Sequence, residues 1–459
     1  MTHTRVPSRH VPARSAGEGR SRGHGRAGPA WRGATAPRAT FGSVFAVHEF
    51  WALWLSEIFS VSGDRLVLVA FTLLVYDRTR SPLLSAAAFA VGFLPYVIGG
   101  LFLADLADRY PRRSVMVACD LARAALVAVM VVPRLPLWAL AVLLFTATVF
   151  SPVFEAARAA ITPEILPGER YVLGTAVITT TLLLAEVLGA AAGGVAVAFT
   201  GVRPALIIDV ATFLLSALII GLGTRHRPPA ARPETVKPTP LTRLRAGFRV
   251  VFGDQALRTL LLFGWLVVFY VIPAGIAAPY VASLGGGPIA AGLAIASTSL
   301  GTAIAAPVFS RFAGPRQRIH WMGPLAVLTC ATLVLTVFHP GLPASLVIFS
   351  LSAVFGSYQI AANTEFVLRT PKERRAQAFG IAGMGVIVGQ GAGWVAAGAV
   401  VQVVAPATVI AIGGGIGAVI ACVLTLSWRR VSPPGGRHAV GRRSRRGLAG
   451  RPVSPTGSG

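Results

Sequence analysis

Long apolar stretches follow one another along most of this 459-residue chain, with short polar segments between them. From residue 47 to residue 428 there are twelve such stretches, each long enough to cross a bilayer of about 30 Å as a helix. Backbone groups in lipid must be paired internally, and these stretches are too long for the strands of a barrel. The pattern therefore predicts an all-α integral membrane protein with twelve transmembrane helices.

The predicted spans divide the chain into five parts. They cover residues 47–76, 83–103, 114–132, 137–161, 171–199, 203–222, 256–284, 289–309, 319–338, 343–368, 376–404 and 408–428. The segment between the sixth and seventh spans is rich in proline and arginine, which is typical of a linker. We predict a disordered basic tail at 1–44, a six-helix bundle at 45–223, a cytoplasmic linker at 224–255, a second six-helix bundle at 256–428 and a disordered basic tail at 429–459.

Basic residues are distributed unevenly, and their distribution predicts the orientation. The net charge is +25, and the first 44 residues and the residues after Trp428 each hold eight arginines. An even number of spans puts both termini on one side, where the short turns also carry more Arg and Lys than the opposite turns. Because basic segments stay in the cytoplasm, we predict cytoplasmic termini in a multi-pass plasma-membrane protein. This orientation explains the tails without a nucleic-acid partner, and attraction to anionic lipid is a further role for them.

One stretch between the second and third spans concentrates charge. From Ala104 to Arg113 it holds two acids and three arginines, with apolar runs on both sides. Pro111 interrupts helix there, because proline lacks the N–H that the helical ladder needs. The arginines favour the cytoplasmic side, and Asp108 with Arg112 and Arg113 can bridge helix ends. A plain loop that only sets orientation is the alternative.

The two halves of the chain look related. Arg158 with Thr162-Pro163 and Glu169-Arg170 recurs as Arg369-Thr370-Pro371 with Glu373-Arg374. Each copy follows the fourth span of its half and precedes a glycine-rich fifth span. Such a repeat predicts two pseudo-symmetric six-helix halves, related by an axis along the membrane normal.

The charged stretch resembles the signature loop of the major facilitator superfamily, Gly-x-x-x-Asp-Arg-x-x-Arg-Arg. Asp108, Arg109, Arg112 and Arg113 match this loop, and Ala104 replaces its glycine. The resemblance extends over residues 47–428. It implies a twelve-helix transporter in which the four matching residues form a gating motif.

Two further stretches are similar to the branch of the superfamily that holds bacterial exporters of macrolides and siderophores. They are Ser62-Gly63-Asp64 in the first span and residues 154–168 near the end of the fourth. The fifth span of the family's antiporters reads Gly-Pro-x-x-Gly-Gly, and here three alanines separate Gly189 from Gly193 and Gly194. The resemblance implies export by antiport, and small residues at these positions allow helices to pack closely.

Ionisable residues within the spans are functional candidates by default, because each costs about 2.5–3.5 kcal/mol on insertion scales. Glu186 lies near the middle of the fifth span, and Asp64 and Arg65 lie near the middle of the first. Asp209 lies less than two turns inside the sixth span, close enough to the outer surface to be hydrated. We predict that Glu186, Asp64 or Asp209 loads and releases a proton, since apolar surroundings favour the neutral form of a carboxyl group. A hydrogen bond from Glu186 to another helix is the alternative.

Other polar residues admit a structural interpretation. Three pairs are spaced for contact within one helix, namely Asp120 with Arg123, Glu155 with Arg158, and Glu365 with Arg369. Residues of the second half that could line a cavity, or only bond neighbouring helices, are Tyr270, Tyr358, Gln359, Asn363, Gln390 and Trp394.

Nothing in the sequence is typical of an enzyme, since it lacks a nucleophile with its base, a phosphate-binding loop and a metal-ligand cluster. We therefore predict no catalytic residues, no metal and no cofactor. The predicted function is export of small amphipathic molecules (drug, antibiotic or siderophore type) by a monomer that exchanges them for protons through alternating access. Two alternatives remain open: uptake of a nutrient or metabolite by proton symport, and a non-transporting membrane receptor or scaffold.

Overall fold

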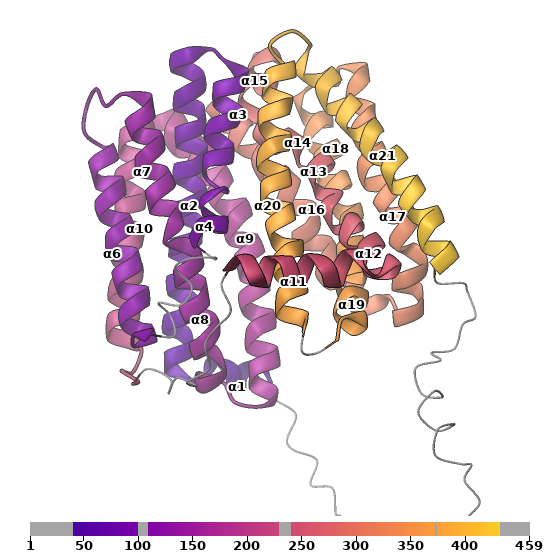
Figure 1. The fold of residues 1–459 in the computed structure, drawn as a ribbon. Helices are drawn as coiled ribbons and strands as arrows, with labels where there is room; N and C mark the ends of the chain where they lie inside the picture. Colours follow the sequence, from indigo (N-terminus) through magenta and orange to yellow (C-terminus); the bar gives the residue numbers. More distant parts are fainter. Residues whose placement is uncertain (1–39, 100–108, 229–239, 372–373, 432–459) are drawn as a thin grey trace, which may run out of the picture. The chain divides into compact units, whose positions relative to one another are not determined.

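A computed structural model describes residues 40–99, 109–228, 240–371 and 374–431 of the chain. Every regular element within these residues is helical (Figure 1). Most of the two predicted tails lies outside the described residues, so their disorder stays a prediction. The first tail is shorter than predicted, because Phe41–Phe45 forms helix α1, which Thr40 and Ser43 stabilise with a capping box.

The first half of the described chain consists of long helices joined by tight turns. After α1 its helices are α2 (His48–Thr79), α3 (Pro82–Val91), α4 (Pro95–Ile98), α6 (Arg112–Met130), α7 (Leu137–Val149), α8 (Ser151–Ile165), α9 (Glu169–Thr200) and α10 (Val202–Gly223). A single residue, Gly201, separates α9 from α10. Its φ of 83° lies in the region that glycine adopts without steric cost, which allows the chain to reverse there.

The second half contains more and shorter helices. They are α11 (Pro240–Phe252), α12 (Gln255–Trp265), α13 (Val267–Tyr270), α14 (Ile272–Gly275), α15 (Ala277–Ser283), α16 (Pro288–Phe312), α17 (Pro315–Val334), the 3₁₀ helix η2 (Leu335–Phe338), α18 (Leu342–Phe355), α19 (Tyr358–Arg369), α20 (Arg375–Val400) and α21 (Pro406–Val431). The predicted linker is thus partly helical, since α11 lies within it. In Figure 1 this helix runs crosswise in front of the lower part of the upright helices.

The helices agree with the predicted membrane spans. Ten are long and apolar enough to cross a bilayer within the part of the chain that the structure describes. The second predicted span corresponds to α3 and α4, and its last residues fall in the undescribed segment 100–108. The third corresponds to α6, whose 19 residues include Asp120 and Arg123. Twelve spans in two halves are therefore consistent with the structure.

The seventh predicted span, 256–284, is not one continuous helix. It consists of α12, α13, α14 and α15, with interruptions at Leu266, Val271 and Ile276. Pro273 lies within this segment, and a proline removes one backbone donor from the helical ladder. The ring of Trp394 on α20 fills the space beside Gly275, where a Cβ atom would overlap it. The interrupted helix therefore packs closely against α20.

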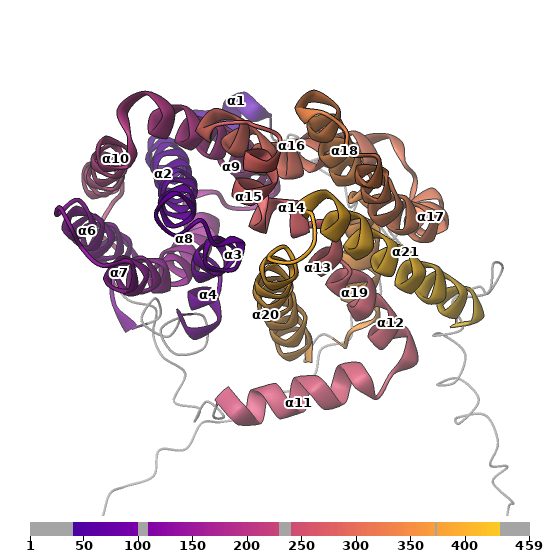
Figure 2. The same cartoon turned by 90° about the horizontal axis from the view of Figure 1, so that it is seen from above.

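Glycines bring helices close together within and between the halves. Gly189 and Gly193 on α9 face α2, where added Cβ atoms would lie 2.7 Å from the Ser62 carbonyl oxygen and 3.1 Å from Leu66 Cα. Gly194 faces α16 of the other half, and a Cβ there would lie 2.9 Å from Gly292 Cα. Figure 2 shows α9 beside α16 at the boundary between the two groups of helices.

A second contact between the halves lies at the same end of the bundle. Gly398, near the end of α20, packs against Leu83 at the start of α3, where a Cβ would lie 3.1 Å from Leu83 Cα. Gly194 is likewise within two turns of the end of α9, and Gly292 within two turns of the start of α16. These ends lie at the top of Figure 1, opposite α1 and α11. The two halves therefore pack tightly at the end away from α11.

Candidate functional site

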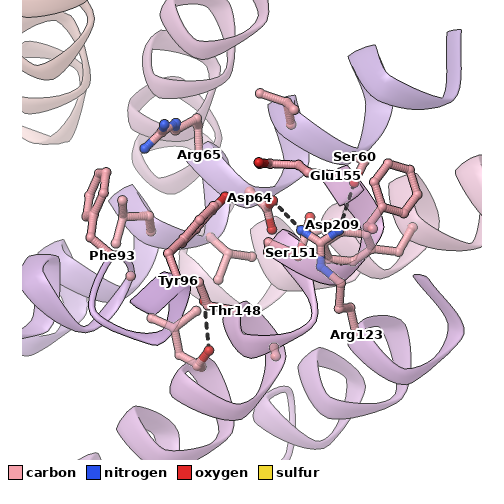
Figure 3. Close-up of a pocket in the computed structure, with 18 of the residues that line it drawn as sticks. Ser60, Asp64, Arg65, Phe93, Tyr96, Arg123, Thr148, Ser151, Glu155 and Asp209 are labelled. Carbon is pink, nitrogen blue, oxygen red and sulfur yellow. Dashed lines mark hydrogen bonds and ion pairs between the residues drawn. The ribbon is translucent and has the colours of Figure 1, made fainter. Parts of the chain in front are cut away.

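A cavity of about 230 Å³ lies within the first half of the chain. Helices α2, α6, α7, α8, α9 and α10 contribute to its walls together with the segment from Gly92 to Tyr96, and Ile387 of α20 adds the second half's contribution. In Figure 3, Phe93 and Tyr96 lie on one side, Arg123 and Asp209 on the other, and Asp64 lies between them. The ionisable side chains of the lining are Glu57, Asp64, Arg65, Tyr96, Arg123, Glu155, Glu186 and Asp209.

Arg65 and Glu186 form an ion pair between α2 and α9. Both residues lie near the middle of 32-residue helices, so the pair is far from either end of the bundle. The guanidinium group of Arg65 also lies over the ring of Phe93, 5.1 Å from its centroid. The prediction considered Glu186 as an unpaired acid, whereas the structure gives it a cationic partner. Each side chain stays about one quarter exposed, so the pair borders the cavity and is not sealed off.

Arg123 is the centre of a second ionic group, and only 1% of its surface is exposed. It forms an ion pair with Asp64 on α2 and donates a 2.9 Å hydrogen bond to the Ser60 hydroxyl. It also lies 3.4 Å from Asp120 on its own helix, in agreement with the predicted i, i+3 pair. The ring of Phe213 on α10 lies beneath the guanidinium group at 4.2 Å. The predicted local pair is therefore part of a larger group that joins three helices.

Glu155 and Arg158 do not behave as the predicted local pair. Arg158 forms its ion pair with Glu57 of α2, where Nε lies 2.9 Å from Oε2. Glu155 instead lines the cavity and is exposed. It makes no ion pair within 4.0 Å with another described residue. The carboxyl group of Glu155 lies within hydrogen-bonding reach of the Tyr96 hydroxyl and borders the cavity.

Asp209 was predicted to be hydrated, and this prediction is wrong. Its exposed fraction is 0%, because α10 packs against α2 and α6 at this point. The carboxyl atom Oδ1 lies 3.2 Å from the Thr212 hydroxyl, and Oδ2 has no hydrogen-bond partner among the described residues. Distance from the helix end was a poor guide to exposure, since neighbouring helices cover Asp209 except where it borders the cavity.

A second cavity, of about 260 Å³, lies between the halves and shares Arg65, Phe93 and Glu186 with the first. Of the predicted lining residues in the second half, Gln390 and Trp394 lie in its wall. The ring of Trp394 contacts those of Phe89 and Phe93, with centroids 4.8 and 4.7 Å apart. The two cavities therefore meet at the Arg65–Glu186 pair.

The other predicted lining residues mainly connect helices. Tyr358 is fully buried and donates a 2.8 Å hydrogen bond to the carbonyl of Phe263. Gln359 donates to the Tyr270 hydroxyl at 3.0 Å, which links α19 to the interrupted seventh span. Asn363 is exposed and lines neither cavity. These bonds correspond to the alternative interpretation, in which polar residues only join neighbouring helices.

The arginines of the charged stretch contact helix ends. Arg112 forms an ion pair with Glu164 near the end of α8, and Arg113 donates to the carbonyl of Gly221 near the end of α10. Arg109 is exposed. Asp108 lies outside the described residues, so its role in a gate stays a prediction.

Sequence reasoning missed the aromatic residues at the break between α3 and α4. Phe93 and Tyr96 line the first cavity from this segment. The sequence signal was Pro95, which indicates an interruption of the second span where side chains can point inward. Phe154 of α8 is a further aromatic residue of the lining.

Comparisons with known proteins agree with this architecture. The profile of the Major Facilitator Superfamily matches residues 53–277 and 269–457. Among solved structures, a POT family transporter in complex with a thioalcohol-conjugated peptide superimposes with a TM-score of 0.69 at 11% identity, covering 84% of this chain and 97% of that one. A mutant of the nucleoside transporter NupG gives a TM-score of 0.65 at 15% identity, covering 83% of this chain and 100% of that one. At these identities the likeness concerns the fold alone.

Curated relatives include proteins named for efflux. Macrolide efflux protein A of Streptococcus pyogenes is 22% identical over 277 residues, which cover 59% of this chain and 68% of the relative. Multidrug efflux pump Tap of Mycobacterium bovis (strain BCG / Pasteur 1173P2) is 26% identical over 345 residues, covering 71% of this chain and 80% of the relative. With the family profile matched over most of its length, the chain belongs to the major facilitator superfamily, and it is a multi-pass plasma-membrane transporter of a small-molecule substrate.

Proposed function

We propose that this protein exports small amphipathic cations in exchange for protons by alternating access. The observation that carries the proposal is the first cavity, which five carboxyl groups and two guanidinium groups line. Each guanidinium group already pairs with a carboxyl group, as does Arg158 outside the lining. The surplus of acidic groups favours a positively charged substrate.

The lining also suits the apolar part of such a substrate. Phe93, Tyr96 and Phe154 contribute aromatic surface beside the exposed carboxyl group of Glu155. A cation over an aromatic face gains about 0.5–2 kcal/mol, more when water is excluded. Glu155 would hold the charged group while the aromatic rings contact the apolar body.

The packing of the two halves supports alternating access. Their close contacts through Gly194 and Gly398 lie at the end away from α11. If the termini are cytoplasmic, as the distribution of arginine predicts, this is the outer end. The conformation is then closed toward the outside, and a substrate would enter from the cytoplasm. The names of the efflux relatives are consistent with this direction.

The test compares two amphipathic dyes in cells that produce the protein. Ethidium carries a permanent positive charge, and Nile red is neutral. We expect the protein to lower ethidium accumulation in the absence of an uncoupler and to act less on Nile red. Glu155→Gln should weaken ethidium export about tenfold or more, because a charge-assisted contact contributes about 1.5–3 kcal/mol.

Glu169→Gln is the matched control, since Glu169 is exposed at the start of α9 and lines neither cavity. It should export ethidium as the unaltered protein does. Ethidium export by Glu155→Gln protein equal to that of the unaltered protein would refute the role of Glu155. Increased ethidium accumulation in producing cells would instead favour uptake.

A further inference from the structure

Asp209 is the most isolated acidic group of the cavity. It comes from α10, is 0% exposed, and its Oδ2 atom has no hydrogen-bond partner among the described residues. Its Oδ1 atom lies 3.2 Å from the Thr212 hydroxyl, which also donates to the backbone carbonyl of Asp209 at 2.8 Å. Figure 3 shows it close to Arg123 on the far side of the cavity from Phe93. The carboxyl group of Asp209 is thus buried at the cavity wall and forms no ion pair with another described residue.

The nearest cation is already committed to other acids. Arg123 pairs with Asp64 and with Asp120, and donates to Ser60. An unpaired ionised carboxylate in such surroundings costs several kcal/mol, whereas its neutral acid is tolerated. The burial of Asp209 without an ion pair therefore favours its neutral form in this conformation.

Asp209 also touches the helix that carries Asp64. A Cβ atom at Gly63 would overlap Oδ1 of Asp209 and the hydroxyl of Thr212, so only glycine leaves room for the carboxyl group. Gly63 directly precedes Asp64 in α2. A change in the charge of Asp209 would thus act one residue away from the Asp64–Arg123 ion pair.

We propose that Asp209 carries the exchanged proton and that Arg123 is the group that displaces it. The proposal deepens the proposed function and rests on it. A cation that enters the cavity attracts Asp64 and Glu155, which frees Arg123 to pair with Asp209. Asp209 then releases its proton to water as Arg123 approaches. One positive charge enters the cavity and one proton leaves, so the exchange is electroneutral.

The position of Asp209 fits reloading from the outside. It lies seven residues after the start of α10, about 10 Å along the helix axis. With cytoplasmic termini that start faces outward, so opening of the outer end would expose Asp209 to external protons. The charged groups that act on it are Asp64 from α2 and Asp120 with Arg123 from α6. Across the same cavity lie Glu57, Arg65, Tyr96, Glu155 and Glu186.

The test measures protons released by purified full-length protein when ethidium binds. Ethidium keeps its charge between about pH 6 and 8, so any proton released comes from the protein. The unaltered protein should release about one proton per ethidium bound, and its affinity should fall by up to tenfold per pH unit on acidification. Asp209→Asn should release none, and its affinity should not change with pH. Asp77→Asn should behave as the unaltered protein, since Asp77 is exposed and pairs with exposed Arg80.

A second variant keeps the Asp209 carboxyl group, so that the proposal can still be tested if Asp209→Asn protein does not fold. Thr212→Val preserves shape and removes a hydroxyl that lies 2.8 Å from the backbone carbonyl oxygen of Asp209 and 3.2 Å from its Oδ1 atom, so the pH of half-maximal proton release should change. A purely structural Thr212 would leave this pH unchanged. Proton release by Asp209→Asn protein equal to that of the unaltered protein would overturn the proposal, as would an unshifted Thr212→Val.

Failure of the two proposals can be told apart. If the unaltered protein neither binds nor transports ethidium, the proposed function is refuted. The assignment of the exchanged proton to Asp209 is then refuted as well. Protein that moves ethidium with proton release independent of Asp209 refutes the assignment alone. If Glu186→Gln abolishes the release instead, the proton belongs to the Arg65–Glu186 pair.

Discussion

Replacing Arg123 by glutamine should destabilise the protein strongly, because its charge serves several buried partners. Asp120 is 0% exposed and would keep only its hydrogen bond from Ser216. Asp64, whose side chain is 32% exposed, would lose its cation but keep contact with the cavity. Removing one partner of a buried ion pair costs about 3–5 kcal/mol. We expect the loss of stability caused by Arg123→Gln to fall in the upper part of this range.

The magnitude can be measured as an apparent unfolding temperature in detergent at one fixed scan rate, because such unfolding is often irreversible. Domains of 150–250 residues lose about 2–4 °C per kcal/mol, and a longer chain loses less. A loss on the order of 5–10 °C is therefore expected. The control is Arg80→Gln, whose pair with Asp77 is about three quarters exposed, and it should change the temperature by about 1–2 °C or less.

A double variant separates charge from packing. Asp120→Asn combined with Arg123→Gln removes the stranded carboxylate together with its cation. It should therefore be more stable than Arg123→Gln alone, although each variant removes native contacts. If Arg123→Gln is no less stable than Arg80→Gln, or if the double variant is less stable than Arg123→Gln, the argument from buried charge is wrong.

Three further predictions concern orientation, the charged stretch and helix contacts. Reporter fusions after Gly42 and after Trp428 should both be active only as cytoplasmic reporters, and a periplasm-active fusion at either point would contradict the twelve-span arrangement. Asp108→Asn should impair ethidium export while the protein still inserts, and normal export would leave the stretch as a plain orienting loop. Gly194→Ala should open the end away from α11 and raise labelling of cysteines introduced there, because its Cβ would lie 2.5 Å from the carbonyl oxygen of Pro288 on the facing helix α16. Gly415→Ala, which meets nothing within 4 Å, should not change the labelling, and equal labelling of both variants would refute the close contact.

The membrane spans could be predicted because their signal is long and local. A run of about 20 apolar residues indicates a helix without knowledge of its neighbours. The only sequence signals for the break in the seventh span are Pro273 and Gly275. Both lie within a continuous apolar run, which by itself predicts one unbroken helix. At this break the ring of Trp394, over one hundred residues away in the chain, packs against Gly275 and donates a 2.9 Å hydrogen bond to the carbonyl of Val271.

Ion pairs within one helix could also be predicted, and those between helices could not. Asp120 with Arg123, and Glu365 with Arg369, follow from helical spacing, and the distances are 3.4 and 3.2 Å. The pair of Arg65 with Glu186 depends instead on the rotation and height of α2 relative to α9. A single sequence shows that these residues lie mid-span, but not which partner each one faces.

The central claim is that an amphipathic cation and a proton cross in opposite directions, and proteoliposomes test it most directly. Purified protein is reconstituted, the lumen is made acidic relative to the outside, and the membrane potential is held at zero. The account predicts that ethidium accumulates in the lumen above its external concentration while the luminal pH rises, and that a protonophore abolishes both changes. Ethidium that only equilibrates, or that accumulates without any rise in luminal pH, would contradict proton-coupled exchange.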